Sequence, residues 1–175
     1  MILGLDISTT TTGFAVLSLD GTVVELGHIS LGKLETVWDK ADAIQTWAHQ
    51  MVSHHTLTHI FVEQSLTAFR PGLSSAAVLA SLTRFNGIAS FIVRQETGLT
   101  PTFIGCTVAR TACGIKVKKG KANGTGKEQA FRHVTSLMLH REWPLTKTGK
   151  VRQECFDEVD AYIIATAGLR SLNTR

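Results

Sequence analysis

The first 31 residues constrain the fold more than any other part of the chain. They contain three extended apolar segments, Met1–Leu5, Gly13–Leu19 and Thr22–Leu31. The dipeptide Asp20-Gly21 between the last two segments is typical of a two-residue β-hairpin turn. Together these features predict three β-strands that pair as an antiparallel meander at the start of the chain.

The spacing of apolar residues changes after the meander. They now recur every three or four positions, which is the period of an amphipathic helix. The helices predicted in this way are Leu34–Val52, Leu73–Thr97, Glu128–Arg141 and Asp157–Leu172. Two short apolar runs, His59–Glu63 and Pro101–Ile104, predict two further strands, and Gly105–Gly114 is a short helical or irregular element. The order predicts an α/β fold: a mixed five-stranded sheet flanked by helices on both faces.

Length and composition restrict the class of protein. With 175 residues, 43% of them hydrophobic and 18% charged, the chain predicts one globular domain over residues 1–175. The uncharged segment 71–83 is too short and too rich in Ser and Thr to span a bilayer. The N-terminus lacks the basic region of a secretory signal. We therefore expect a cytoplasmic protein with no membrane partner. Its net charge of +4 is compatible with a polyanionic partner but does not require one.

Four carboxylates stand where apolar elements end or begin. Asp6 follows the first apolar run, Glu63 closes a later one, and Asp157 and Asp160 lie three residues apart on one predicted helix face. Residues at the carboxyl ends of parallel strands gather at one crevice of an open α/β sheet. We therefore expect the four side chains to meet. The alternative is structural, because Asp157 and Asp160 could complement a helix dipole and Asp6 could cap a turn.

Such a cluster predicts a metal site. Four carboxylates without Lys or Arg partners would repel one another and take up protons unless divalent cations neutralise them. Oxygen donors without a His or Cys cluster favour Mg²⁺, with Mn²⁺ as a substitute. Two such ions in one active site would activate a water and stabilise the leaving oxygen of a phosphodiester. The predicted activity is that of a nuclease.

The sequence resembles a known family at three motifs, LGLDIS-TTTTG-FAV, IFVEQS and FDEVDAYIIA. They are similar to those of RuvC-type Holliday junction resolvases of the ribonuclease H-like superfamily. The resemblance implies a homodimer that makes Mg²⁺-dependent paired nicks in branched, four-way DNA. It also implies that Asp6, Glu63, Asp157 and Asp160 are the catalytic metal ligands and that Lys127 lies near the scissile phosphate. The Lys/Gly segment Ile115–Lys127 is longer than expected of cellular members, which favours a viral or phage member of the family. We therefore expect the protein to act in a bacterium or a phage-infected host.

Further residues are candidates for DNA contact. The segment Ile115–Lys127 predicts a basic loop that contacts phosphates, although a merely solvated loop is the alternative. Its lysines are Lys116, Lys118, Lys119, Lys121 and Lys127. Phe69 and Arg70 could stack on an unpaired base, with core packing as the rival for Phe69. Thr9 and Thr10 could offer hydroxyl groups to a phosphate, or simply form a turn.

Other activities remain open from the sequence. Related nucleases that act on flaps, forks, other branched DNA or RNA–DNA hybrids would need the same acids. Actin-like and sugar-kinase ATPases begin with a similar first strand, but they need a second lobe for which this chain has too few residues. A catalytically inactive DNA-binding module is a third class. It would have no reason to keep the four acids.

Overall fold

The computed structural model of the protein describes residues 1–65 and 75–173. Its five-stranded sheet has the order β3-β2-β1-β4-β5. The strands are β1 Ile2–Ile7, β2 Thr11–Leu17, β3 Val23–Ser30, β4 His59–Glu63 and β5 Thr102–Ile104. The first three pair antiparallel, whereas β1–β4 and β4–β5 pair parallel. The predicted meander and mixed five-stranded sheet are therefore confirmed.

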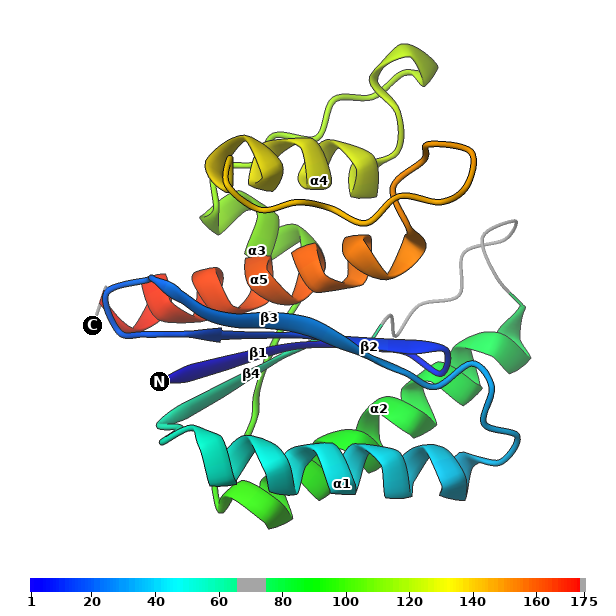
Figure 1. Cartoon of the computed structure of the whole chain (residues 1–175), viewed down its shortest axis with the longest axis vertical. Coiled ribbons are helices and arrows are strands. Elements are labelled where there is room, and N and C mark those ends of the chain that lie inside the picture. Colours follow the sequence, from blue (N-terminus) through cyan, green and yellow to red (C-terminus); the bar gives the residue numbers. More distant parts are fainter. Residues whose placement is uncertain (66–74, 174–175) are drawn as a thin grey trace.

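Helices cover both faces of the sheet (Figure 1). One face carries α1 and α2, and the other carries α5 and α3, with α4 packed outside α5. The helices are α1 Val37–His54, α2 Ala76–Thr97, α3 Cys106–Ala112, α4 Gly126–Leu137 and α5 Gln153–Leu172, with a short 3-10 turn at Lys121–Asn123. The flanking layers agree with the predicted α/β class.

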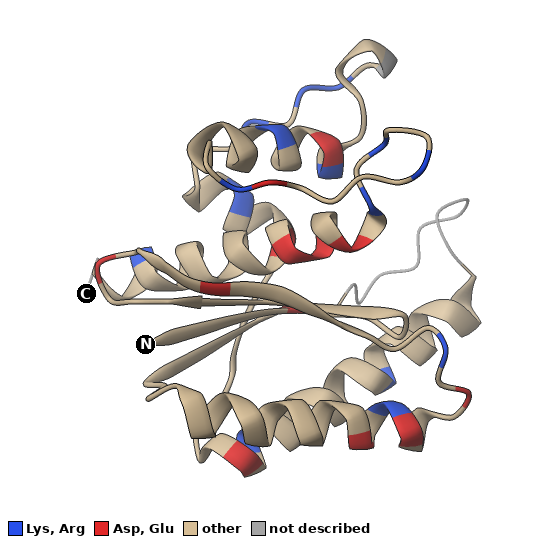
Figure 2. Ribbon diagram, viewed as in Figure 1, with Lys and Arg blue, Asp and Glu red and all other residues tan. Residues whose placement is uncertain are grey.

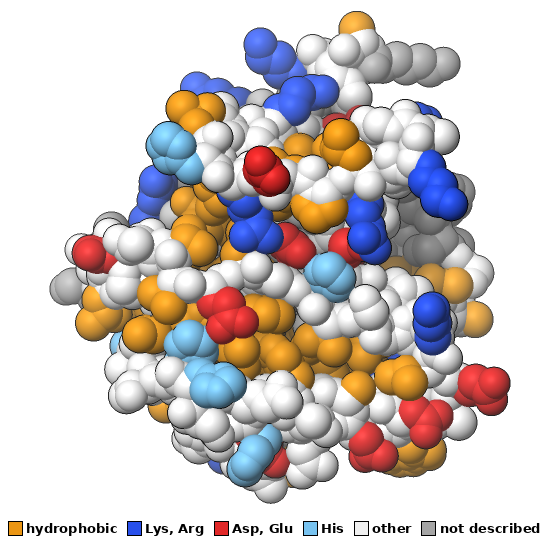
Figure 3. Space-filling view, in the orientation of Figure 1, with side chains coloured by type: hydrophobic (Ala, Val, Ile, Leu, Met, Phe, Trp, Pro, Cys, Tyr) orange, Lys and Arg blue, Asp and Glu red, His pale blue; other side chains and the backbone are white. Residues whose placement is uncertain are grey.

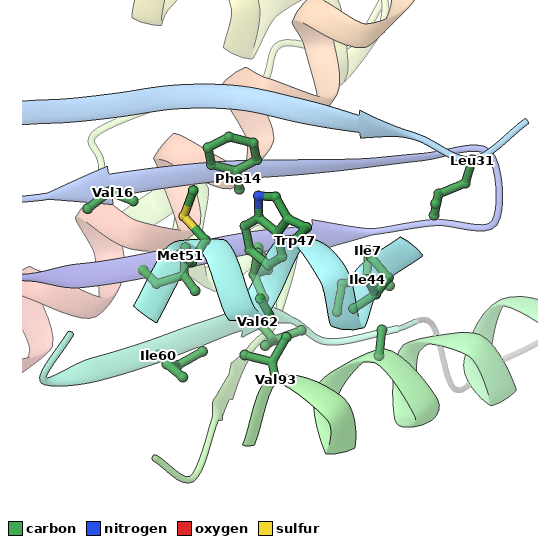
Figure 4. Close-up of a cluster of buried hydrophobic side chains, with 14 of the residues drawn as sticks. Ile7, Phe14, Val16, Leu31, Ile44, Trp47, Met51, Ile60, Val62 and Val93 are labelled. Carbon is green, nitrogen blue, oxygen red and sulfur yellow. The ribbon is translucent and has the colours of Figure 1, made fainter. Parts of the chain in front are cut away.

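Alternation along the central strands sorts their side chains between two cores. Odd-numbered residues of β1, such as Leu3 and Leu5, face α1 and α2, where Trp47 packs on Phe14 with ring centroids 5.1 Å apart (Figure 4). Even-numbered positions of β1 face α5 instead. Each fully buried aliphatic side chain contributes about 1.5–3 kcal/mol of transfer free energy. The register of the sheet is therefore held by burial on both faces, and Asp6 must point toward α5.

Helix α5 lies unusually close to the sheet because small residues line the contact. A Cβ added at Gly4, Gly13 or Gly168 would come closer than 3.0 Å to a neighbouring atom across this contact. For Gly4 and Gly13 the nearest of these atoms belongs to the backbone of α5. Close approach of the helix backbone is thus possible only where the strands carry no side chain.

Several helix boundaries differ from the sequence prediction. α4 spans Gly126–Leu137. It begins at Gly126 because Thr125 and Glu128 form a capping box, so Lys127 lies on a helix and not in a loop. α5 begins at Gln153, four positions before the predicted start at Asp157. Asp157 and Asp160 therefore lie beyond its first turn, which removes the dipole-complementing explanation for them.

Among the described helices, α2 alone is long and apolar enough, by length and composition, to cross a membrane. A core helix of a soluble protein passes the same test. α2 contributes Phe85, Ala89 and Val93 to the core beside α1. Its outer face is also apolar, with Val78 and Phe91 about half exposed. The helix thus combines a core face with an apolar surface patch.

Candidate active site

The side chains of Asp6 and Glu63 lie next to each other at the ends of two neighbouring strands. Leu5 of β1 pairs with Val62 of β4 in parallel register, so the two acids that follow stand at the same level and face α5. Both border a pocket of about 190 Å³ at the carboxyl ends of these strands. Asn86 of α2 lines the same pocket, and its Nδ2 donates to the backbone oxygen of Glu63 at 3.1 Å. This bond holds the end of β4 in place.

The other two carboxylates come from α5. Asp157 and Asp160 lie one helical turn apart and are buried, with 8% and 6% of their surface exposed. Gly13 of β2, the register partner of Asp6, lies against the backbone of Asp157. The helix can therefore bring its acids to the end of β1. The structure thus places the four predicted acids at one end of the sheet.

The pKa values reflect this proximity. Burial, reinforced by the negative charges of Glu63, Asp160 and Asp157, raises the pKa of Asp6 well above its usual value. Burial and the charge of Asp160 raise the pKa of Glu63 to about 7. Burial also raises the pKa of Asp157, although Lys127 opposes the shift. The site therefore carries more negative charge than its own cations neutralise.

Two basic side chains enter the cluster, so the prediction that the acids lack Lys or Arg partners is wrong. Lys127 Nζ lies 2.5 Å from Asp157 Oδ1 and 3.5 Å from Asp160 Oδ2. Arg110 of α3 donates to Asp160 Oδ1 at 3.1 Å. Although burial lowers the pKa of Lys127, the charges of the acids around it raise that pKa above its usual value. The partners come from α3 and α4, which only tertiary packing brings over α5.

Sequence reasoning missed Arg110. A signal was present, because Arg110 is the one charged residue between Glu96 and Lys116 and it lies in an otherwise apolar and hydroxyl-bearing stretch. Its guanidinium is mostly buried, with 17% of the side chain exposed. A buried arginine is held by a carboxylate in most settings. The spacing along the chain did not indicate which one.

The donor set fits a divalent cation in its chemistry. Among the described residues, neither Asp6 nor Glu63 has a side-chain hydrogen bond or ion pair, and the nearby charges of Lys127 and Arg110 offset their raised pKa values only in part. Carboxylate oxygens are the donors that Mg²⁺ and Mn²⁺ prefer. In the described part of the chain, however, no three His, Cys, Asp or Glu side chains converge closely enough to hold an ion. Lys127 and Arg110 neutralise Asp157 and Asp160 in this arrangement.

The predicted DNA-contacting residues have different outcomes. Lys116, Lys118 and Lys119 are exposed on the segment between α3 and α4, while nothing is described of the Lys121 side chain. Phe69 and Arg70 lie outside the described residues. The remaining candidates lie at the turn between β1 and β2.

This turn is organised by its serine. Ser8 Oγ accepts from the backbone N–H of Thr11 at 3.1 Å and lies 3.3 Å from Thr10 Oγ1. The backbone oxygen of Thr9 accepts from Lys40 Nζ at 2.8 Å. Thr10 is exposed, whereas Thr9 is half-buried. Both threonines stand close in sequence to Asp6, at the carboxyl end of β1.

Charges gather on this face of the molecule. Figure 2 shows acidic residues in the first half of α5 and basic residues on the segments around it, and Figure 3 shows acidic side chains flanked by basic ones. Acidic and basic residues thus occupy different segments of this face. Their charges cancel in the sum, which agrees with a net charge of only +4.

Comparison with solved structures identifies the fold. RuvC of T. thermophilus in complex with a Holliday junction substrate matches with a TM-score of 0.69 at 14% identity, over 99% of this chain and 94% of that chain. The chain has a RuvC-like fold. A second structure of Thermus thermophilus RuvC matches with a TM-score of 0.68 at 14% identity, covering 99% of this chain and 95% of that one. The yeast mitochondrial Holliday junction resolvase Ydc2 matches with 0.57 at 14% identity, over 97% and 77% of the two chains. No protein-family model matches the sequence, and no curated protein matches it.

Proposed function

We propose that this protein is a metal-dependent endonuclease that resolves four-way DNA junctions by paired nicks. The observation that carries the proposal is the placement of Asp6, Glu63, Asp157 and Asp160 at one end of a RuvC-like sheet, near enough for their charges to raise one another's pKa values. The raised pKa values of Asp6, Glu63 and Asp157 favour the binding of a positively charged ligand. The neighbour of similar fold was solved with a Holliday junction substrate, which supports branched DNA as the partner.

The four carboxylates would hold two Mg²⁺ ions per active site, with Mn²⁺ as a substitute. When bound, such ions supply an activated water and stabilise the leaving oxygen of the phosphodiester. The chain contributes the rest. Lys127 keeps 35% of its side chain exposed, so its ammonium group can reach a phosphate oxygen as well as Asp157. Arg110 binds Asp160 Oδ1, whereas Lys127 lies near Oδ2, so the two cations together fix the orientation of this carboxylate.

Two nicks in one junction require two sites, so we propose a homodimer. The apolar outer face of α2 supports it. Val78 is 49% and Phe91 58% exposed, and a second copy would bury them. We further propose that the protein acts in the cytoplasm of a bacterium or a phage-infected host, as a member of a viral or phage branch.

The decisive experiment is nicking of a synthetic four-way junction with Mg²⁺. Symmetric nicks about the branch are expected, and Asp6→Asn or Glu63→Gln should abolish them while junction binding in EDTA survives. Asp42→Asn is the matched control, because Asp42 is exposed on α1, which covers the opposite face of the sheet from α5. Full activity of Asp6→Asn would contradict the proposed site.

The choice of substrate separates the remaining activities. Faster cleavage of flaps, forks or RNA–DNA hybrids than of junctions would reassign the substrate. Failure to nick any of them with Mn²⁺ present would indicate a DNA-binding module instead. Tight binding of ATP in calorimetry would favour the ATPase class.

A further inference from the structure

The segment between α4 and α5 is a small hairpin, which we call the 143–152 hairpin. Its two arms are joined by an antiparallel bridge between Leu145 and Val151. The backbone N–H of Thr146 donates to the oxygen of Lys150 at 2.7 Å, and the N–H of Arg152 donates to Pro144 at 3.0 Å. Gly149 turns the chain with a φ of 76°. These bonds give the segment a defined shape.

The base of the hairpin is tied to the core. The Trp143 ring meets Phe131 of α4 edge to face, with centroids 5.0 Å apart. The Arg141 guanidinium lies over the same ring at 4.8 Å and binds Glu158 Oε2 at 2.6 Å. Glu158 in turn meets His28 of β3 at 2.8 Å. The position of the hairpin relative to α5 is therefore fixed by aromatic packing and by partly buried polar contacts of Glu158.

A hollow of about 690 Å³ opens between the hairpin and the first turns of α4 and α5. Lysines stand on two sides of it, Lys150 from the hairpin and Lys127 from α4, and Phe156 of α5 supplies an apolar wall. The acid at its rim, Glu128, accepts from the backbone N–H of Thr125 at 2.6 Å within the capping box. The lysines lining the hollow thus outnumber its acids, and its carboxylate already has a partner.

One residue, Lys127, links this hollow to the carboxylate cluster. Lys127 lines the hollow, and the same Nζ lies 2.5 Å from Asp157. Lys150 lines the hollow and is exposed, and Lys147, also exposed, lies three positions before it on the same hairpin. A phosphodiester chain with one phosphate at the carboxylates would therefore pass Lys127 and lie along these two lysines. A phosphodiester chain should bind such a row of cations more tightly than a single anion does, because each of its phosphates contacts a different lysine.

We propose that the 143–152 hairpin and this hollow bind the sugar–phosphate backbone of a DNA arm next to the cleaved phosphate. Lys147 and Lys150 contact successive phosphates, and Phe156 and Val151 pack against the deoxyribose. The inference rests on the proposed function and extends it to a second contact surface. Because the contacts are to the backbone, they position the arm without reading its sequence.

Binding measurements test the inference. Lys147→Ala, Lys150→Ala and their double variant are titrated against a fluorescent four-way junction in EDTA, at salt concentrations from about 50 to 200 mM. The logarithm of the association constant falls linearly with the logarithm of the salt concentration, and each lost phosphate contact makes this slope shallower by about 1. It also weakens binding up to about eightfold at 0.1 M salt. The double variant should therefore lose about two units of slope. A linear duplex should show the same loss, as expected of a backbone contact.

Controls keep the outcomes separate. Lys33→Ala removes an exposed lysine from the loop before α1 and should leave the affinity and the slope unchanged. Circular dichroism and thermal melting should be unchanged in the hairpin variants, since the lysine side chains are exposed. An unaltered affinity and slope in the double variant would overturn the inference.

Two further results distinguish the proposals. A wild-type protein that binds junctions but nicks none would contradict the proposed function alone, while loss of affinity in the hairpin variants would still support the DNA contact. Inorganic phosphate is the second probe. Tight binding of phosphate that Lys150→Glu abolishes, together with unchanged junction binding, would show a free-anion site and overturn the DNA inference.

Discussion

Gly13 of β2 lies against the backbone of Asp157 in α5, so closely that a Cβ at this position would come within 3.0 Å of the Asp157 carbonyl group. Gly13 is also the register partner of Asp6 across the antiparallel pair. One missing side chain thus lets a helix carboxylate approach a strand carboxylate. The distance between these two halves of the site depends on it.

Replacing Gly13 by alanine should therefore damage the site. The added methyl group pushes α5 from the sheet, and overpacking of this kind costs about 1–3 kcal/mol of unfolding free energy. Nicking activity should fall far more than this cost implies, because the acids on α5 move away from Asp6. Gly87→Ala is the matched control: Gly87 lies in α2 with open space around it, so alanine should stabilise by about 0.5–1 kcal/mol. A fully active Gly13→Ala protein would contradict the argument.

Asp6→Asn should raise stability while it abolishes activity. The pKa of Asp6 is raised by burial and by three acidic neighbours, so the ionised carboxylate opposes folding at neutral pH. Removing its charge should stabilise the protein by on the order of 1 kcal/mol without divalent cations. Thermal melting in EDTA measures the change, with Asp42→Asn as the exposed control. A lower melting temperature for Asp6→Asn would show that the carboxylate has a stabilising partner.

Stability should depend on pH through Glu63. Its pKa of about 7 lies above the ordinary value of 4.5, so between these values the folded state binds more protons than the unfolded state. Stability without divalent cations should therefore fall as the pH rises through that window. Mg²⁺ competes with the proton, so its stabilising effect on the melting temperature should be larger near pH 8 than near pH 5.5. Two results would refute this role of Glu63. One is an equal rise of the melting temperature with Mg²⁺ at pH 8 and pH 5.5, and the other is an unchanged pH dependence of stability in Glu63→Gln.

Glu158 should matter for stability although it is not among the predicted catalytic residues. It is 5% exposed and binds both His28 and Arg141. Removing it in Glu158→Ala leaves the Arg141 charge without its partner and should cost about 3–5 kcal/mol in urea unfolding. Glu154→Ala on the same helix is the control, because its pair with the half-exposed Arg152 is worth about 0–1 kcal/mol. Similar losses of unfolding free energy in the two variants would contradict the argument from burial.

Much of the fold could be predicted from local patterns. The Asp20-Gly21 turn and the apolar runs around it indicated the meander, and a period of three to four residues indicated the main helices. Boundaries were less predictable, because they depend on local contacts such as the capping box of α4. Thr125 and Glu128, for example, begin α4 before Lys127, and α5 starts at Gln153.

The sequence by itself determined which acids can meet, because alternation in β1 and β4 points Asp6 and Glu63 to one face and a spacing of three puts Asp157 and Asp160 together. Only the tertiary structure decided what surrounds them. Lys127 and Arg110 reach these acids across 30 and 50 positions of chain, respectively. Such contacts depend on how α3 and α4 pack on α5, and helix packing is a property of whole surfaces that no local pattern of residues contains.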